Sequence, residues 1–355
     1  MDAKRVFKGR GAVSNPAGRF ETAPSVAVHD GWDRRDDEDF PNPDPATSFL
    51  PDKTRNIIAT NNSPDIPFDQ SINPYKGCEH GCVYCYARPT HAFLDLSPGL
   101  DFETKIFYKT DPVDRLLEAL DKPGYVCRTL ALGTNTDPYQ PGEKQLKVTR
   151  RVLETLLRCR HPVSIVTKGA LILRDLDILR EFAGLGLVSV GISITTLDSE
   201  LKTKLEPRTA SPGARLRVVR ELKAANVPVG VMLAPVIPFI NDHEIETIID
   251  RCAEAGAEYV GYVMLRLPFE VKDLFVEWLQ EHYPLKAEHV MSRVREMRGG
   301  KAYQAEWGTR MRGEGVYADL VAKRFEVARR KHGLDTSRRA DLRTDLFRRG
   351  QGMLF

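Results

Sequence analysis

Three cysteines stand close together in a sequence that is otherwise poor in cysteine. They are Cys78, Cys82 and Cys85, with the spacing C-x3-C-x2-C. Thiolates are soft ligands that bind iron–sulfur clusters, zinc or Cu(I). A [4Fe–4S] cluster normally takes four cysteines, so three leave one iron free to bind the amine and the carboxylate of a small molecule. The spacing therefore indicates a [4Fe–4S] cluster that can deliver an electron to a bound ligand.

Zinc is the alternative metal for the same cysteines. A structural zinc ion takes four protein ligands in a tetrahedron, usually from paired knuckles. His80 could be the fourth ligand, but the sequence has no second C-x-x-C. The remaining cysteines stand alone in or beside predicted strands and helices, and they are Cys127, Cys159 and Cys252. The cluster is the first interpretation and zinc the second.

The composition is that of an ordinary globular chain. Of the 355 residues, 42% are hydrophobic and 28% are charged, which excludes a wholly disordered chain, a collagen and a coiled coil. The net charge of +3 does not identify a nucleic-acid-binding protein. Six cysteines are too few for a disulfide-rich secreted fold, so we expect a cytoplasmic protein. No membrane association is predicted, because the most apolar stretch, residues 227–240, has 14 residues and three prolines.

Short apolar runs alternate with amphipathic helical patterns between residues 70 and 270. The runs are Ser71–Tyr75, Val126–Gly133, Pro162–Thr167, Leu187–Ile194, Pro228–Ala234 and Tyr259–Leu265. Helices are predicted at Gln145–Cys159, Arg174–Phe182, Gly213–Ala225 and Asp242–Ala255. Strands that are apolar throughout and are each followed by a helix are typical of parallel βα units. Six units are too few for a closed eight-stranded barrel, so we expect an α/β fold with a partial (β/α)6 TIM-type barrel.

The chain divides into three regions that differ in composition and hydrophobic pattern. Residues 1–55 are rich in Gly, Pro, Asp and Arg without a hydrophobic period, which predicts an extended or disordered N-terminal arm. Residues 56–275 form the barrel core. Residues 276–355 form a helical C-terminal extension, and segment 281–355 has 17 Lys and Arg against 10 Asp and Glu, a local charge of +7. We interpret this extension as a solvated surface, with a basic nucleic-acid-binding face as the alternative.

The run NPYKGCEHGCVYCYARPTHAF, placed after the first strand, carries a resemblance to a known family. It resembles the radical S-adenosylmethionine (SAM) superfamily over residues 68–270, and within it the branch described as DNA repair photolyases or spore photoproduct lyase-like proteins. The resemblance implies that Cys78, Cys82 and Cys85 hold the cluster and that SAM binds the fourth iron. It also implies an enzyme that reductively cleaves SAM to a 5′-deoxyadenosyl radical, which abstracts hydrogen from a substrate. The electron would come from a reductant of the flavodoxin or ferredoxin type.

The resemblance also suggests which side chains bind SAM. Thr136 and Asp137 stand where the lyase branch has a Ser/Thr-Asp pair, although Asp-Pro is equally an ordinary turn signal. Lys168 ends the third strand and matches a lysine that binds SAM in the lyase, with an exposed strand-end lysine as the alternative. Ser193 ends the fourth strand and resembles a serine that reaches the SAM ribose, a task for which Thr195 is also placed.

Two tyrosines, Tyr84 and Tyr86, flank the third cysteine. The lyase has tyrosines at both positions, and there they line the active site and take part in radical transfer. The resemblance therefore suggests the same catalytic roles here. Packing against the cluster is the alternative for Tyr84.

One departure from the lyase limits the resemblance. The lyase returns a hydrogen atom from a cysteine three residues before the Asp of its pair, and that position is Thr134 here. Cys127 lies at the start of the same strand, which places it more than about 20 Å away at about 3.3 Å per residue. We therefore predict that this protein is not a spore photoproduct lyase. The first candidate for the substrate is a nucleic-acid base, with a peptide or protein and a small metabolite as the alternatives. The alternative to an enzyme is a non-catalytic iron–sulfur electron carrier or sensor.

Overall fold

The six apolar runs form the parallel strands of one sheet in a computed structural model, which describes residues 6–21, 45–334 and 341–350. The strands are β3 (Gln70–Ile72), β6 (Leu130–Leu132), β7 (Val163–Thr167), β8 (Val188–Ser193), β9 (Val229–Val236) and β10 (Val260–Met264). Their order is β10-β9-β8-β7-β6-β3, and β2 (Ile58–Thr60) pairs antiparallel with β3 at the edge. Within the described chain β10 does not pair with β2, so the barrel stays open. The prediction of a partial (β/α)6 barrel is confirmed.

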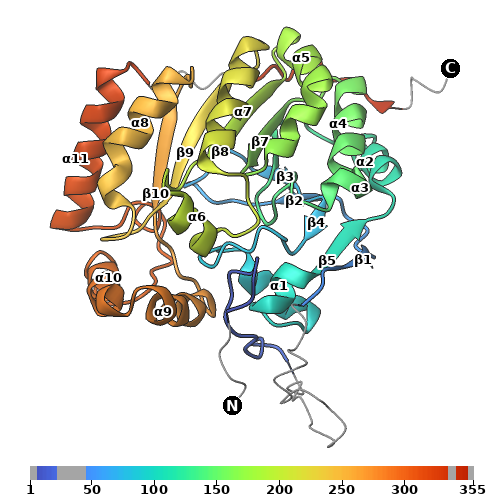
Figure 1. The fold of residues 1–355 in the computed structure, drawn as a ribbon. Helices are drawn as coiled ribbons and strands as arrows, with labels where there is room; N and C mark the ends of the chain where they lie inside the picture. Colours follow the sequence, from blue (N-terminus) through green and yellow to red (C-terminus); the bar gives the residue numbers. More distant parts are fainter. Residues whose placement is uncertain (1–5, 22–44, 335–340, 351–355) are drawn as a thin grey trace, which may run out of the picture.

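Helices between the strands cover the outer side of the sheet (Figure 1). They are α4 (Val148–Arg158), α5 (Leu176–Gly184), α7 (Pro212–Ala224) and α8 (Ile245–Glu254), whereas α6 (Ser199–Leu205) lies beyond the carboxyl end of β8. Two 3₁₀ helices, η3 (Ala170–Asp175) and η4 (Asp242–Glu244), precede α5 and α8. In α8 the buried side chains are Ile245, Ile248, Ile249 and Cys252, as the apolar stripe predicts. All six residues of β8 are buried, because helices on one side and the barrel interior on the other cover the strand.

Two predicted elements differ from the structure. The predicted helix over residues 145–159 is divided, because Lys147 adopts a left-handed backbone with φ of 51°. A short helix, α3 (Glu143–Leu146), precedes this break and α4 follows it. The second strand begins four residues later than predicted, at Leu130 rather than Val126, and the Val126 side chain is 59% exposed. Apolar residue type alone did not show that Val126 lies outside the packed sheet.

A second, three-stranded sheet lies beside the barrel. Its strand order is β1-β5-β4, with β1 parallel to β5 and β4 antiparallel to it. The elements here are β1 (Ser48–Asp52), β4 (Tyr75–Lys76), the 3₁₀ helix η2 (Arg88–Leu94), α1 (Leu100–Thr104), β5 (Lys105–Lys109) and α2 (Pro112–Leu120). The expectation of an unpacked N-terminal arm is thus corrected for β1, whose backbone pairs with a strand more than fifty residues later.

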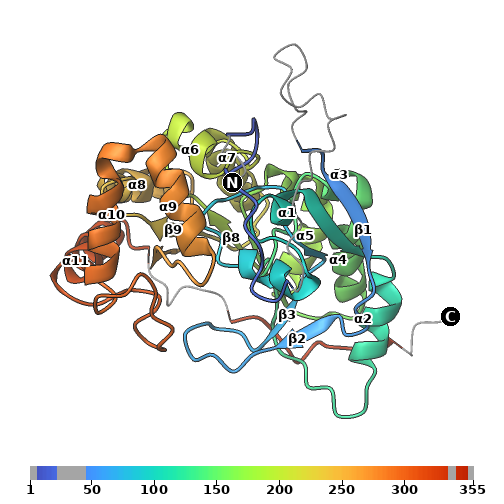
Figure 2. The same ribbon diagram turned by 90° about the horizontal axis from the view of Figure 1, so that it is seen from below.

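The stretch 6–21 is also packed on the body of the protein, next to α1 (Figure 2). Arg10, Ala12 and Val13 are buried there. The backbone N–H groups of Gly11 and Ala12 donate to the Glu103 carboxylate at 3.0 and 2.9 Å. These polar contacts hold a segment that has no hydrophobic period, which is why the sequence did not reveal it. The rest of the predicted arm, residues 1–5 and 22–44, lies outside the described residues.

The C-terminal extension is helical, as predicted. It contains α9 (Val271–His282), α10 (Pro284–Glu296) and α11 (Val316–Lys331). Figures 1 and 2 show α11 beside α8, and α9 beside α10. No helix in the described part of the chain has the length and apolar character to cross a membrane.

Two basic residues of α11 are paired with acidic residues of the barrel, and several others are paired within the extension. Arg324 on α11 forms an ion pair with Glu246 on α8 at 2.6 Å, and Lys331 forms one with Asp250 at 3.2 Å. The local positive charge therefore partly compensates the acidic face of α8. This arrangement favours the interpretation of a solvated helical surface for α11.

Candidate active site

The three cysteines lie in the loop that joins β4 to η2, beyond the carboxyl end of β3. Cys78 and Cys82 are 6% and 7% exposed, and Cys85 is half-buried. Burial raises the pKa of all three thiols, and for Cys78 the charges of Asp137, Cys82 and Cys85 raise it further. Because the pKa of each thiol is raised, its thiolate form needs a nearby positive charge, such as that of iron, to stabilise it.

The position of His80 bears on zinc as the alternative metal. A structural zinc ion takes four protein ligands, and His80 was the candidate for the fourth. The Nδ1 atom of His80 lies 3.2 Å from the Oδ2 atom of Asp137, so this ring nitrogen faces a carboxylate. The arrangement therefore disfavours zinc with His80 as fourth ligand.

A buried arginine supports the cysteine loop from below. Arg88 is fully buried, and its guanidinium donates to the carbonyl oxygens of Cys82 and Gly81 at 2.9 and 3.1 Å. It also pairs with the buried carboxylate of Glu103 at 2.5 Å. The N-terminal stretch completes this support, because a side chain on Gly11 would collide with the carbonyl oxygen of Gly81. Sequence reasoning missed both Arg88 and Glu103, although a charged residue three positions after Cys85 was a possible signal.

Thr136, which was predicted to bind SAM, holds the other side of the loop. Its hydroxyl donates to the carbonyl oxygen of Gly77 at 2.7 Å and accepts from Gln140 at 3.1 Å. Gln140 is fully buried, and its amide oxygen accepts from the backbone N–H of Glu79 at 2.8 Å. Gly77 has φ of 80°, a left-handed conformation that glycine adopts without strain. Thr136 and Gln140 thus fix the backbone immediately before Cys78.

Asp137, the second residue of the predicted pair, is occupied by hydrogen bonds within the protein. Its Oδ1 atom accepts from the hydroxyl of Thr167 at 2.6 Å, and its Oδ2 atom accepts from the backbone N–H of Lys168 at 2.8 Å. Burial would raise the pKa of Asp137, but His80 and these hydrogen bonds lower it to about 2. The carboxylate therefore ties the end of β6 to the end of β7 and is ionised.

Lys168 projects from the end of β7 toward the cysteine loop. Its ammonium lies 5.8 Å from the centre of the Tyr84 ring. Burial raises the pKa of the Cys82 thiol, while the charge of Lys168 acts in the opposite direction. Among the residues that the structure describes, no carboxylate lies within ion-pair distance of this ammonium. Lys168 is therefore the predicted cofactor-binding side chain whose charge is free to meet an anionic group.

A buried polar network lies beneath Tyr84. The Tyr84 hydroxyl donates to the Glu206 carboxylate and lies 3.3 Å from the hydroxyl of Thr195. The fully buried Glu206 also pairs with Arg215, which is 2% exposed and donates to the carbonyl oxygen of Ser193 at 2.9 Å. Burial would raise the pKa of Glu206, but the charges of Arg215 and Lys168 lower it to about 2. The network locks Tyr84 in place and anchors the end of β8.

Replacing Glu206 by Gln is expected to lower the free energy of unfolding by about 3 kcal/mol at neutral pH, because Arg215 loses its buried counter-charge. The ordinary pKa of 4.5 is lowered to about 2 in the folded protein, so the stabilisation by Glu206 is complete above pH 4.5 and is lost as the pH falls toward 2. Urea unfolding of wild type and variant across this range should therefore give a difference that shrinks with falling pH. Glu200→Gln, which changes an exposed side chain, is the matched control, and a pH-independent difference would contradict the expectation.

Tyr86, Thr134 and Ser193 lie around the same end of the barrel. The Tyr86 ring is 48% exposed, and its hydroxyl donates to the carbonyl oxygen of Thr134. Ser193 is 4% exposed at the end of β8, and its hydroxyl has no hydrogen-bond partner among the described residues. Cys127 precedes the first residue of β6, whereas Thr134 follows the last one. The structure therefore places Thr134, and not a cysteine, beside Tyr86.

Arg208, in the loop that follows α6, contacts the cysteine loop. Its guanidinium lies 3.2 Å from the Glu79 carboxylate in the cysteine loop. The neighbouring residue Glu206 is the buried member of the same Glu-Pro-Arg-Thr segment, and sequence reasoning overlooked it. Glu206 differs from Arg208 because α7 packs on β8 and brings Arg215 next to the Glu206 carboxylate.

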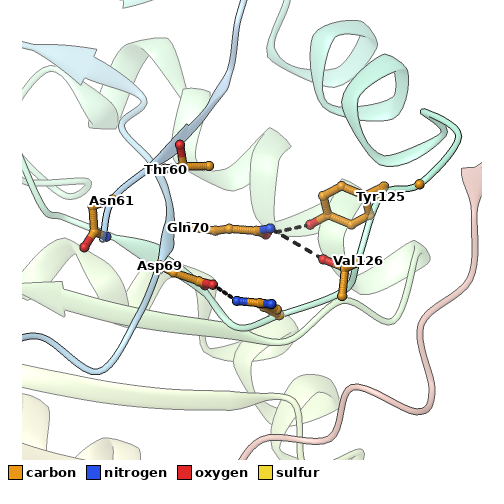
Figure 3. A pocket seen from close by; sticks show the side chains of 8 residues that line it. Thr60, Asn61, Asp69, Gln70, Tyr125 and Val126 are labelled. Carbon is orange, nitrogen blue, oxygen red and sulfur yellow. Dashed lines mark hydrogen bonds and ion pairs between the residues drawn. The ribbon is translucent and has the colours of Figure 1, made fainter. Parts of the chain in front are cut away.

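A shallow pocket at the other end of the barrel does not belong to this site. Its volume is about 310 Å³, and it lies between the start of β3 and the loop before β6 (Figure 3). Gln70 accepts from the hydroxyl of Tyr125 at 3.1 Å, and Arg128 pairs with Asp69. These polar groups are satisfied within the protein, and the pocket faces away from the three cysteines.

Comparisons with known proteins agree with this geometry. The model of the radical SAM superfamily matches residues 72–252. An uncharacterized protein of Mycobacterium tuberculosis is 38% identical over 238 residues, covering 66% of this chain and 69% of its own length. An uncharacterized protein of Methanocaldococcus jannaschii is 27% identical over 224 residues, covering 63% of this chain and 80% of its own length.

Solved structures of spore photoproduct lyase share the fold. The lyase complexed with dinucleoside spore photoproduct has a TM-score of 0.55 and 17% identity, and the match covers 80% of this chain and 78% of that one. A variant with bound SAM and the same dinucleoside has a TM-score of 0.54 at 16% identity, covering 80% and 77%. At this identity the likeness concerns the fold alone. The match to residues 72–252, which include the three cysteines of the loop, shows that the chain belongs to the radical SAM superfamily.

Proposed function

We propose that this protein cleaves SAM reductively at a [4Fe–4S] cluster and abstracts a hydrogen atom from a substrate, for which a nucleic-acid base is the first candidate. The observation that carries the proposal is the set of three cysteines beyond the carboxyl end of β3, two buried and one half-buried, in a chain of the radical SAM superfamily. When bound, the cluster would pass one electron from a flavodoxin- or ferredoxin-type reductant to SAM, giving methionine and the 5′-deoxyadenosyl radical that removes the hydrogen.

The residues of this chain divide into those that bind and those that position. Cys78, Cys82 and Cys85 would hold the cluster. We assign Lys168 to the carboxylate of SAM, because its ammonium faces the cysteine loop without a described counter-ion. Ser193, whose hydroxyl has no described partner, is assigned to the ribose. Thr136 and Asp137 act as positioning residues, because their side chains are used to hold the loop and the end of β7.

Tyr86 is the stronger candidate of the two tyrosines for a catalytic role. Its ring is 48% exposed beside Thr134, whereas the buried Tyr84 hydroxyl is occupied by hydrogen bonds with Glu206 and Thr195. Cys159 and Cys252 are fully buried in the outer helical layer, and Cys127 lies at the amino end of β6. Among the described residues the only thiol next to Tyr86 is that of Cys85, which is assigned to the cluster. We therefore propose that the reaction does not end with the cysteine hydrogen donation that the lyase uses.

Reduction of the reconstituted protein with dithionite in the presence of SAM tests the enzymatic function. We expect 5′-deoxyadenosine and methionine in equal amounts, because each cleavage yields one of each. Chromatography of the quenched mixture measures both, and protein without the cluster is the control. A non-catalytic electron carrier or sensor would hold the cluster and produce neither, and that result would overturn the proposal.

A further inference from the structure

Arg266 carries a positive charge that the described part of the protein does not neutralise. It lies two residues beyond β10, is half-buried, and places its guanidinium 5.7 Å from the centre of the Tyr86 ring. Its remaining contacts are weak, with the thioether of Met311 at 3.4 Å and the hydroxyl of Tyr303 at 3.5 Å. No carboxylate of the described residues lies within ion-pair distance of Arg266.

A second guanidinium lies close behind the first. Arg298 is 1% exposed and donates to the carbonyl oxygens of Leu265 and Thr309 at 3.0 and 3.1 Å. Burial lowers the pKa of Arg298 to about 10, and the charge of Arg266 contributes to this shift. The Nε atoms of both arginines are buried without a hydrogen-bond partner. Two positive charges therefore lie close together, and the Nε–H donor of each arginine has no acceptor among the described residues.

Two acidic groups act on these charges, Asp65 on Arg266 and Glu314 on Arg298, and Asp65 is already engaged. Asp65 accepts from the backbone N–H of Gly308 at 2.7 Å and pairs with Arg310 at 2.5 Å. Holding two arginine charges together in a partly buried place costs free energy unless an anion joins them. The planar guanidinium fork matches the oxygens of a phosphate group. The positive charge of Arg266 is thus available to bind an anionic ligand.

The position of Arg266 relates that ligand to the candidate active site. The ring beneath its guanidinium belongs to Tyr86, which follows the cluster ligand Cys85 and is exposed on its other parts. Tyr303 adds a second aromatic side chain from the C-terminal extension. An anion bound by Arg266 would therefore place the group attached to it against Tyr86, close to the cluster loop.

We propose that Arg266, backed by Arg298, binds a phosphate group of the substrate and that Tyr86 contacts the nucleoside attached to it. The inference rests on the proposed function for its use of the site, and it names the substrate class as a phosphorylated nucleoside. The phosphate belongs either to a mononucleotide or to the backbone of a single-stranded nucleic acid. In both cases the same guanidinium makes the contact.

Binding of a fluorescein-labelled single-stranded oligodeoxynucleotide, followed by anisotropy on the cluster-reconstituted protein, tests the proposal. Arg266→Gln should weaken binding by about tenfold or more, because a hydrogen-bonded charge contact is lost. The slope of log Kd against log salt should fall by about 1. Arg217→Gln removes the same charge from the exposed face of α7 and should change binding by about twofold or less.

Competition separates the two sources of phosphate. Thymidine 5′-monophosphate that displaces the oligonucleotide from wild type, and does so less well from Arg266→Gln, assigns the site to a mononucleotide. Displacement only by a longer unlabelled strand assigns it to a polynucleotide backbone. Both results support the phosphate contact.

Arg266→Lys serves as the second variant, because it keeps the positive charge and removes the planar guanidinium group. Thermal melting followed by circular dichroism checks the fold of each protein. We expect the affinity of Arg266→Lys to lie between those of wild type and Arg266→Gln. Equal losses for Arg266→Gln and Arg217→Gln, or wild-type affinity of Arg266→Lys, would overturn the inference. So would wild-type protein that binds neither probe, while production of 5′-deoxyadenosine by the same sample would leave the proposed function standing.

Discussion

Replacing Cys78 by alanine is expected to abolish the iron–sulfur cluster and all cleavage of SAM while the barrel stays folded. Two thiolates cannot hold a cube that needs three protein ligands and an open iron. The fold should survive because the main core is aliphatic, with Leu132, Val190 and Val231 at 1% exposure or less. Iron content per chain, the visible absorbance of the cluster and 5′-deoxyadenosine formation measure the loss, and circular dichroism measures the fold.

Cys127→Ala provides the matched control for this variant. It removes a thiol that lies before β6, at the end of the barrel opposite the cysteine loop. We expect full iron content and full SAM cleavage from it. Global unfolding of Cys78→Ala, or cluster loss in Cys127→Ala, would be incompatible with the assignment of ligands.

Replacing Arg88 by methionine is expected to lower the free energy of unfolding by about 3–5 kcal/mol, because the change leaves the Glu103 carboxylate buried without its partner. Both side chains are fully buried in the wild-type protein. The cysteine loop also loses the donors that hold the carbonyl oxygens of Gly81 and Cys82. Iron retention should therefore fall together with stability. Denaturant unfolding of the cluster-free protein isolates the first effect, and iron content after reconstitution measures the second.

Arg115→Met is the control for Arg88→Met. Arg115 pairs with Glu118 on the exposed face of α2, where the two side chains are 41% and 62% exposed. An exposed pair of this kind contributes about 0.2–1 kcal/mol, so the control should change little. If Arg88→Met were as stable as Arg115→Met, the buried pair with Glu103 would not support the cysteine loop.

The strands could be predicted from the sequence because their environment is simple. Parallel strands covered on both faces are continuous apolar runs, and β8 and β9 match their predicted positions closely. Local backbone geometry was less visible. The left-handed conformation of Lys147, which divides the predicted helix, has no signal in residue type. The strand β1 was missed for a related reason, since its partner β5 lies far along the chain.

In the candidate site, the sequence pointed to side chains suited to the proposed chemistry but not to those that hold them in place. The three cysteines were evident from spacing alone. The hydrogen bonds that occupy Asp137 come from Thr167 and Lys168 on the neighbouring strand, and only the register of β6 against β7 brings them there. Tyr84 and Glu206 likewise meet across 122 residues. Such contacts depend on the tertiary fold, so a single sequence does not show them.

The contact between the N-terminal stretch and Glu103 has a consequence for how the protein is made. The carboxylate that accepts the N–H of Gly11 is synthesised 92 residues after it. The stretch 6–21 therefore cannot dock until α1 has been synthesised. We expect chains that lack residues 6–21 to form an intact barrel but to retain less iron after reconstitution. This defect would resemble the loss of a cysteine ligand.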